Sequence, residues 1–270
     1  MKFLHVIGEF DIKAGGTYTA LISLIKMFNE LGHTNTIIAT GKHSGKQGLD
    51  VDLFCFEKSF PVKFRKSKKG KQWLSENIDN YDAVIIHEIW GGIGLDACMI
   101  ALKRGIPYHI WPHGSLDPFD LQKRKYLKKI LGKLLVNKVL RNAKYICCTS
   151  EKEKQVINCF GKTANNIISV LLPIDFCLEK QIVQPRPSLI RSELPDDAFV
   201  FLFFSRINYK KGLDLFLRAF AECLAEKRIK LNSYFLIAGT GSPEYEKYID
   251  DLIFELNLQS HVIKLGLVTG

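Results

Sequence analysis

Two basic side chains, Arg206 and Lys211, lie in a loop, residues 205–212, that joins an apolar run to an amphipathic pattern. The run, residues 199–204, is short and apolar, as a strand buried in a parallel sheet would be. The residues after the loop predict a helix, because apolar side chains recur on one face: Leu213, Phe216, Leu217, Phe220 and Leu224. The sequence therefore predicts a strand, a basic loop and a helix, in that order.

A loop of this kind lies at the carboxyl edge of an open α/β sheet, where ligands bind. The free N–H groups at the start of a helix, and the positive end of its dipole, favour an anion there. Arg206 and Lys211 add two positive charges, so the loop suits a diphosphate. The alternative is a basic loop that is merely solvated, and the loop taken alone leaves both interpretations open.

His113 follows a predicted strand, residues 108–111, and Pro112, and it precedes Gly114. This order indicates a tight turn that holds the imidazole at the carboxyl edge of a sheet. A lone histidine is more often structural, but this setting favours a functional role. Several other histidines have no comparable setting, and we interpret them as structural: His5, His33, His43, His109 and His261.

Gly15 and Gly16 precede a second amphipathic pattern, which runs from Leu21 to Leu31 and ends at Gly32, its expected C-terminal cap. Two glycines at the start of a helix let a ligand and the backbone approach closely. The dinucleotide fingerprint G-x-G-x-x-G is absent from this stretch. A ligand-contacting loop is the favoured interpretation, and a loop without a ligand is the alternative.

The net charge of +10 is concentrated in two stretches. Residues 121–150 contain no acidic side chain, and their basic residues alternate with an apolar helical pattern: Lys123, Arg124, Lys125, Lys128, Lys129, Lys133, Lys138, Arg141 and Lys144. A second basic cluster occupies residues 63–71, where we expect a loop. A basic amphipathic helix is typical of contact with an anionic membrane, which residues 123–144 would then make.

The alternative for this stretch is a core-facing helix with a solvated lysine face, and we favour it slightly because domain packing needs the same apolar stripe. Nucleic acid would suit the charge as well. No nucleic-acid-binding motif accompanies the basic residues, so we expect no nucleic acid partner.

Composition indicates a cytoplasmic globular protein. Hydrophobic residues make up 47% of the chain, and no segment has the 18 or so consecutive apolar residues of a spanning helix. The seven cysteines are odd in number and lack C-x-x-C spacing, as is typical of reduced, buried thiols. His87 and Glu88 form an H-E pair without the second histidine of H-E-x-x-H, so we expect no metal and no cofactor.

Strand-like runs alternate with helical patterns along most of the chain, which predicts mainly parallel, doubly wound sheets. Residues 1–180 form the first domain in this interpretation. Residues 181–197 contain several prolines within a weakly periodic stretch and are interpreted as a linker. Residues 198–270 then give about half of a second α/β domain.

Four ordered blocks together resemble the GT-B glycosyltransferases of family 4, also called group 1 glycosyl transferases. They are Gly15-Gly16 with the Leu31-Gly32-His33 helix end, residues 111–118 around His113, residues 205–212, and residues 238–243. The resemblance implies two Rossmann-like domains, the second incomplete. It implies that Arg206 and Lys211 hold the diphosphate of a nucleotide-sugar and that His113 contacts the transferred sugar. Gly15, Gly16, Gly239 and Gly241 would contact the nucleotide-sugar as well.

The implied function is a retaining, metal-independent hexosyltransferase. It would use a UDP- or GDP-sugar and a glycan or lipid-linked acceptor in cell-surface polysaccharide synthesis, in the cytoplasm and at the inner face of the plasma membrane. The acceptor would bind the first domain and the donor the second. Relatives also have two glutamates eight positions apart, a spacing absent here. We therefore expect a chain truncated before that motif, and the alternative is a non-catalytic relative that acts as a binding module or partner subunit.

Overall fold

The computed structural model divides the chain into two compact units, Met1–Cys177 and Leu178–Gly270. It describes residues 1–12, 15–43, 45–46, 48–122, 125–160, 166–173, 194–195 and 197–268. Most of the expected linker, residues 181–193 and residue 196, lies outside the described residues.

Unit 1 is built on a seven-stranded parallel sheet with the order β3-β2-β1-β4-β5-β6-β7. Its strands are β1 (Lys2–Ile7), β2 (Thr34–Thr40), β3 (Asp52–Phe56), β4 (Ala83–His87), β5 (Tyr108–Trp111), β6 (Tyr145–Cys148) and β7 (Ile167–Ser169). The order reverses direction between β1 and β4, and at such a switch point the loops diverge and leave a crevice at the carboxyl edge. This confirms the predicted doubly wound α/β fold.

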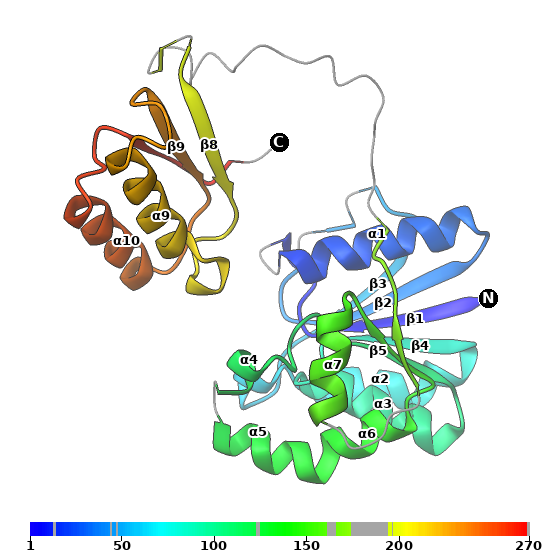
Figure 1. Ribbon diagram of the computed structural model, residues 1–270. Helices are drawn as coiled ribbons and strands as arrows, with labels where there is room; N and C mark the ends of the chain where they lie inside the picture. Colours follow the sequence, from blue (N-terminus) through cyan, green and yellow to red (C-terminus); the bar gives the residue numbers. More distant parts are fainter. Residues whose placement is uncertain are drawn as a thin grey trace. The chain divides into compact units, whose positions relative to one another are not determined.

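Helices cover both faces of this sheet (Figure 1). They are α1 (Gly16–Glu30), α2 (Lys68–Asn77), α3 (Gly92–Arg104), α4 (Pro118–Gln122), α5 (Lys125–Leu131), α6 (Asn137–Asn142) and α7 (Glu151–Phe160). On one face, α2, α3 and α6 pack over the largest apolar cluster; on the other, α1 packs over Ile7, Ile37 and Ala39. Because both faces are covered, apolar side chains fill most of the buried positions of the strands.

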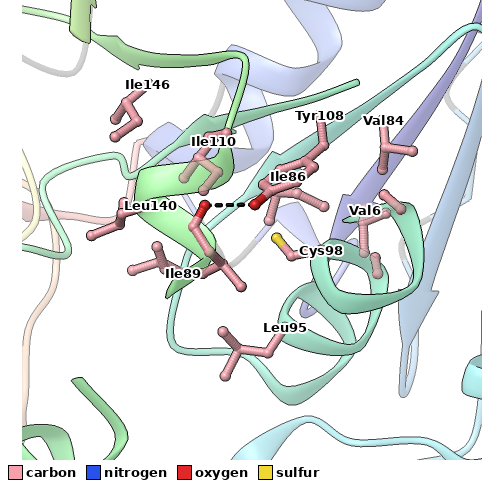
Figure 2. Packing of buried hydrophobic residues seen from close by; sticks show 14 of the residues in the cluster. Val6, Val84, Ile86, Ile89, Leu95, Cys98, Tyr108, Ile110, Leu140 and Ile146 are labelled. Atoms are coloured by element: carbon pink, nitrogen blue, oxygen red, sulfur yellow. Dashed lines mark hydrogen bonds between the residues drawn. The ribbon is translucent and has the colours of Figure 1, made fainter. Parts of the chain in front are cut away.

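Figure 2 shows the core beneath α3 and α6, where Val84, Ile86 and Ile110 of the sheet meet Leu95 and Cys98 of α3. A tyrosine lies among these apolar side chains, and its hydroxyl requires a partner. Tyr108 donates a hydrogen bond of 2.7 Å to the backbone carbonyl of Val139 in α6. This bond ties the helix to the sheet.

Two expectations about the basic stretches were wrong in detail. The pattern over residues 121–150 predicted one amphipathic helix, whereas a π-helical segment, Gly132–Val136, separates α5 from α6. The cluster at residues 63–71 was expected in a loop, but α2 begins at Lys68. Ser67 caps that helix by accepting a hydrogen bond of 3.1 Å from the Gly70 amide, which offsets the unfavourable lysines of the first turn.

Unit 2 contains a three-stranded parallel sheet with the order β10-β9-β8. Its elements are β8 (Phe199–Phe204), α9 (Leu213–Ala225), β9 (Ser233–Ala238), α10 (Pro243–Glu255) and β10 (Val262–Gly266). Both helices pack on one face of the sheet (Figure 1). Leu194 and Ala198 pack on the other face against Leu236, so Leu194 belongs to the core of this unit.

Strand β8 is an edge strand within the described part of unit 2, and its side chains alternate in exposure. Phe203 is buried under the helices, while Leu202 is 61% exposed and Phe204 is 71% exposed. A sheet of three strands with β8 exposed on one side agrees with the expected partial second α/β domain.

Replacing Tyr108 with Phe should lower the free energy of unfolding of unit 1 by about 1–2 kcal/mol, because the buried Val139 carbonyl loses its partner. The three tryptophans of the chain, Trp73, Trp90 and Trp111, all lie in unit 1, so urea unfolding followed by tryptophan fluorescence measures this unit. Tyr145→Phe, at a 38% exposed site, is the control and should have little effect. Equal losses in both variants would contradict the assignment.

Candidate functional site

Several polar side chains of unit 1 gather where strands of its sheet end. Glu9 lies just beyond β1, Lys58 beyond β3, Glu88 directly after β4 and His113 two residues after β5. In a parallel sheet all these ends lie at the same edge, so residues distant in sequence become neighbours.

His113 occupies a strained turn at this edge. Its φ angle is 50° and that of Gly114 is 72°, so both residues have the left-handed conformation, which is uncommon for a residue other than glycine. The Ser115 amide closes the turn by donating a hydrogen bond of 3.0 Å to the Pro112 carbonyl. The tight turn predicted from the sequence is confirmed, and backbone strain of this kind is often found at functional sites.

His113 is the outer member of a row of three histidines. Its Nε2 lies 3.1 Å from Nδ1 of His87, and Nε2 of His87 lies 3.2 Å from Nδ1 of His5. Burial lowers the pKa of His5 and of His113 to about 4 each and holds the pKa of His87 well below its usual value. All three imidazoles are therefore neutral at pH 7.

Sequence patterns missed this row. They favour a structural role for His5 and indicate His87 only as half of a metal motif. The signal lies in the strand register: Ile7 of β1 is opposite His87 of β4, so His5, two residues before Ile7, points to the same face. That register depends on β4 lying beside β1, which sequence order does not give.

The row does not have the geometry of a metal site. His87 uses one ring nitrogen toward each neighbour, so the nitrogens form a line and do not converge on one point. Among the described residues, no group of three or more potential ligands is arranged to hold a metal ion.

Glu153 in the first turn of α7 joins the His113 turn to the end of β6. Its carboxylate accepts hydrogen bonds from the Gly114 amide at 2.7 Å, the Thr149 amide at 2.8 Å and the Thr149 hydroxyl at 3.0 Å. A pocket of about 220 Å³ lies beside this junction. It is lined by Gly114, Leu116, Asp117, Thr149, Ser150, Lys152, Glu153 and Val156.

A charged cluster occupies the same edge next to β1. Arg65 forms an ion pair with Glu88 and lies 3.9 Å from Glu9, which forms an ion pair with Lys58. Burial raises the pKa of Glu88, and the Arg65 guanidinium opposes this rise. Glu88 also has a left-handed φ of 80°.

Gly8 makes room for this cluster, because a Cβ at that position would lie 2.5 Å from Cδ of Arg65. No local sequence pattern identifies these residues, since they come from three separate loops.

A second pocket, of about 190 Å³, borders the charged cluster. Its lining includes Lys63, Arg65, Trp90 and Lys128, together with Phe64, Gly91 and Leu131. Lys128 Nζ lies 5.1 Å from the centre of the Trp90 ring, and the Trp90 indole donates a 2.8 Å hydrogen bond to the Ser115 carbonyl. The pocket therefore combines a fixed aromatic ring with three cationic side chains, a combination suited to an anionic group.

In unit 2, Arg206 and Lys211 lie where the sequence predicts them, in the loop between β8 and α9. Both side chains are exposed, and Lys211 lines a pocket of about 190 Å³ with the edge strand β8 and Phe216. Gly212, with φ of 66°, ends a short 3₁₀ turn and begins α9. The loop thus presents two positive charges at the start of a helix.

Gly239 and Gly241 have a packing role that the sequence did not reveal. A Cβ on Gly239 would lie 1.9 Å from the Ser205 carbonyl oxygen, and one on Gly241 would lie 2.1 Å from that of Ile207. The Ile207 amide donates a hydrogen bond of 2.9 Å to the Thr240 carbonyl across the same contact. These glycines hold the two loops of unit 2 together, which brings residues 239–241 beside Arg206.

Gly15 and Gly16 differ from this pattern. Gly15 precedes α1 with φ of 64° and ψ of −128°, a conformation that favours glycine. A Cβ on Gly16 would meet nothing within 4 Å, so packing does not explain its identity. Residues 13–14 of this loop lie outside the described residues.

The predicted site residues therefore form two groups. His113, Gly15 and Gly16 belong to unit 1, and Arg206, Lys211, Gly239 and Gly241 belong to unit 2. Their proposed contacts with a ligand remain predictions.

Comparison with protein families gives two matches that together cover most of the chain. Residues 14–175 match the model of Glycosyltransferase Family 4, and residues 187–269 match that of Glycosyl transferases group 1. The boundary between the two matches falls near the boundary between the two units.

Curated relatives match short segments. An uncharacterized glycosyltransferase of Methanocaldococcus jannaschii is 35% identical over 75 residues, which are 28% of this chain and 18% of that protein. A trehalose-6-phosphate synthase of Mycobacterium leprae is 41% identical over 64 residues, or 24% of this chain and 13% of that protein. The chain thus spans less than a fifth of the length of these relatives.

Solved structures match the whole chain. The Anabaena protein HepE, solved in complex with UDP and glucose, has a TM-score of 0.73 at 19% identity, over 100% of this chain and 70% of that one. The lipopolysaccharide outer core galactosyltransferase WaaB has a TM-score of 0.64 at 22% identity, over 100% and 69%. At these identities the likeness establishes the fold.

Gly239→Ala should destabilise unit 2, because the new methyl group would overlap the Ser205 carbonyl and φ of 146° is strained for alanine; we expect a loss on the order of 2–4 kcal/mol. Faster hydrogen exchange across β8 and β9 would report it. Gly16→Ala, where the Cβ meets open space, is the matched control and should leave exchange in α1 unchanged. Wild-type exchange in Gly239→Ala would contradict the packing role.

Acidification should weaken unit 1 through its buried histidines. Below pH 6.5 the unfolded chain binds protons at His5 and His87, while the folded state excludes them until about pH 4 at His5, so the free energy of unfolding falls as pH drops through this window. The slope is about 1.4 kcal/mol per pH unit for each histidine. Urea unfolding at pH 7, 6 and 5 should show a shallower dependence in His5→Leu. Identical slopes would contradict the neutral, buried state of His5.

Proposed function

The chain belongs to glycosyltransferase family 4, and we propose that it is a retaining hexosyltransferase that takes its sugar from a UDP- or GDP-sugar. One observation carries this proposal: Arg206 and Lys211 are exposed, cationic and held at the start of α9 by tightly packed loops. A sugar diphosphate is the ligand that this arrangement suits. The complex of the similarly folded Anabaena protein with UDP-glucose supports the choice of donor class.

In this proposal the two cations act on the leaving group. As the glycosidic bond breaks, negative charge grows on the departing diphosphate, and Arg206 and Lys211 neutralise it. Charges held in place before the reaction stabilise such a transition state more than they stabilise the ground state.

His113 of unit 1 would contact the transferred sugar. The charged cluster and the two pockets of unit 1 would receive the acceptor. The pocket lined by Lys63, Arg65 and Lys128 suits an acceptor that carries phosphate or carboxylate groups, as many glycan and lipid-linked acceptors do. We propose an acceptor of this class, within cell-surface polysaccharide synthesis.

Helix α5, which contributes Lys128 to this pocket, also carries exposed apolar side chains, which supports peripheral contact with an anionic membrane through residues 123–144. Tyr126 is 83% exposed and Ile130 is 58% exposed, four residues apart on one helix. Lys123 and Arg124 lie outside the described residues. No helix in the described part of the chain is long and apolar enough to cross a bilayer. We therefore propose a cytoplasmic enzyme that works at the membrane surface.

A second candidate is a non-catalytic relative that binds a partner or a nucleotide without transfer. The exposed cations Arg206 and Lys211 would bind a nucleotide equally well if no transfer followed. This candidate keeps nucleotide binding by unit 2 but excludes turnover of a nucleotide-sugar.

Replacing Arg206 or Lys211 with Ala should weaken binding of UDP or GDP by roughly tenfold each, because each removes a charge-assisted contact with phosphate. Calorimetry or saturation-transfer NMR on the purified chain measures it. Arg218→Ala is the matched control, since Arg218 is an exposed arginine of α9 that lies 4.0 Å from Glu255.

Equal affinities in wild type, Arg206→Ala and Lys211→Ala would remove the phosphate assignment. Transfer or hydrolysis of a nucleotide-sugar by the wild-type chain would favour the enzyme, whereas binding without turnover would favour the second candidate.

A further inference from the structure

The row of three histidines continues into a longer chain of hydrogen bonds across unit 1. At its inner end, Nε2 of His5 lies 2.9 Å from Oδ1 of Asn35 in β2. His5 and His87 are fully buried, at 0% and 1% exposure, and Asn35 is 5% exposed. Buried polar side chains linked in series are costly to place in a protein core, so the arrangement calls for a specific role.

The contacts of Asn35 and Asn29 set the donor-to-acceptor direction of this series of hydrogen bonds. The Asn35 amide nitrogen donates 2.6 Å to Oδ1 of Asn29 and approaches the His33 carbonyl at 3.5 Å. The Asn29 amide nitrogen in turn donates 2.8 Å to the backbone carbonyl of Asp50. A backbone carbonyl can only accept, so neither asparagine can flip without placing two oxygens or two donors face to face.

This direction fixes each proton in turn. Because Asn35 presents an oxygen, Nε2 of His5 must carry a proton, and neutral His5 then has a bare Nδ1. That nitrogen accepts from Nε2–H of His87, whose own bare Nδ1 accepts from Nε2–H of His113. The result is that His113 is left with a lone pair on Nδ1.

His113 Nδ1 has no hydrogen-bond partner among the described residues of this chain, and its ring lies at the carboxyl edge of the sheet. A bare nitrogen accepts a hydrogen bond from a hydroxyl group. It offers nothing to a fully ionised phosphate, which also lacks a proton to donate.

We propose that Asn35, His5 and His87 are positioning residues that lock His113 in the Nε2–H tautomer, so that its Nδ1 accepts a hydrogen bond from a sugar hydroxyl. The tautomer follows from the hydrogen-bond geometry and from the neutral state of the buried rings. The choice of a sugar hydroxyl rests on the proposed function of the site.

Long-range ¹H–¹⁵N spectra of the histidine rings test the tautomer directly. In the wild-type chain at pH 7.5, His5, His87 and His113 should each show a protonated Nε2 and a bare Nδ1. A protonated Nδ1 on His113 in the wild type would overturn the proposal without any variant.

His87→Phe keeps a planar ring between the other two histidines but removes the acceptor for His113 Nε2–H. We expect the ring nitrogens of His113 to shift toward the averaged values of two exchanging tautomers. His109→Phe, on the neighbouring strand β5 but outside the chain of hydrogen bonds, is the control and should leave the His113 signals unchanged. Wild-type His113 signals in a folded His87→Phe protein would overturn the relay, with tryptophan fluorescence reporting folding.

Asn35→Leu is a second variant, which cuts the chain at its far end and leaves the contact between His87 and His113 in place. Without Asn35 the hydrogen bonds can run in either direction, so we expect His5 and His113 both to populate the Nδ1–H tautomer as well. Retention of the pure Nε2–H state in this variant would show that Asn35 does not set the direction.

Ligand binding separates this inference from the proposed function. Saturation-transfer NMR measures binding of UDP, UDP-glucose, GDP and GDP-glucose. For each nucleotide, the affinity for the nucleotide-sugar divided by the affinity for the nucleotide alone gives the contribution of the sugar. His87→Phe should reduce that ratio roughly three- to tenfold, the worth of one hydrogen bond, and leave UDP and GDP binding unchanged. An unchanged ratio would reject the sugar contact, while failure of all nucleotides to bind would reject the proposed function and leave the tautomer result to decide the relay.

Discussion

The parallel sheet of unit 1 is buried on both faces, and this constraint decides where its chemistry can lie. The interior positions of β1, β4 and β5 are taken up by apolar packing against α1 on one side and α2 and α3 on the other. The polar groups of the candidate site therefore lie mainly at the carboxyl edge, where the strands end. His113, Glu88 and Glu9 all lie there, although Glu9 and His113 are 104 positions apart in the sequence.

His5 and His87 are buried polar side chains, and the cost of burying an imidazole explains why they are linked in a row. A buried imidazole must be neutral and must satisfy both nitrogens. His5 and His87 meet this requirement only through their neighbours, so none of the three histidines can change its tautomer alone. The same low polarity that penalises the row keeps its hydrogen bonds strong and directional.

Local patterns predicted most elements, because the spacing of apolar residues that marks a buried strand or an amphipathic helix is visible within a few consecutive residues. The strand Phe199–Phe204, the basic loop after it and α9 follow the sequence prediction closely. The pairing of Arg65 with Glu88, and of His5 with His87, depends on strand order and loop paths that no local pattern contains. The π-helical segment Gly132–Val136 was missed for a related reason, since one extra residue in a turn hardly alters an apolar stripe.

The hydrogen bonds of Glu153 affect the entropic cost of binding a ligand in the neighbouring pocket. One carboxylate holds the backbone of Gly114 and of Thr149, so two loops that would otherwise fluctuate independently move as a single body. The conformational freedom of these loops is lost when the protein folds, so a ligand binds to a pocket lining that is already ordered. The affinity of a ligand then depends mainly on how well it complements the lining, because binding carries little further cost of ordering the loops.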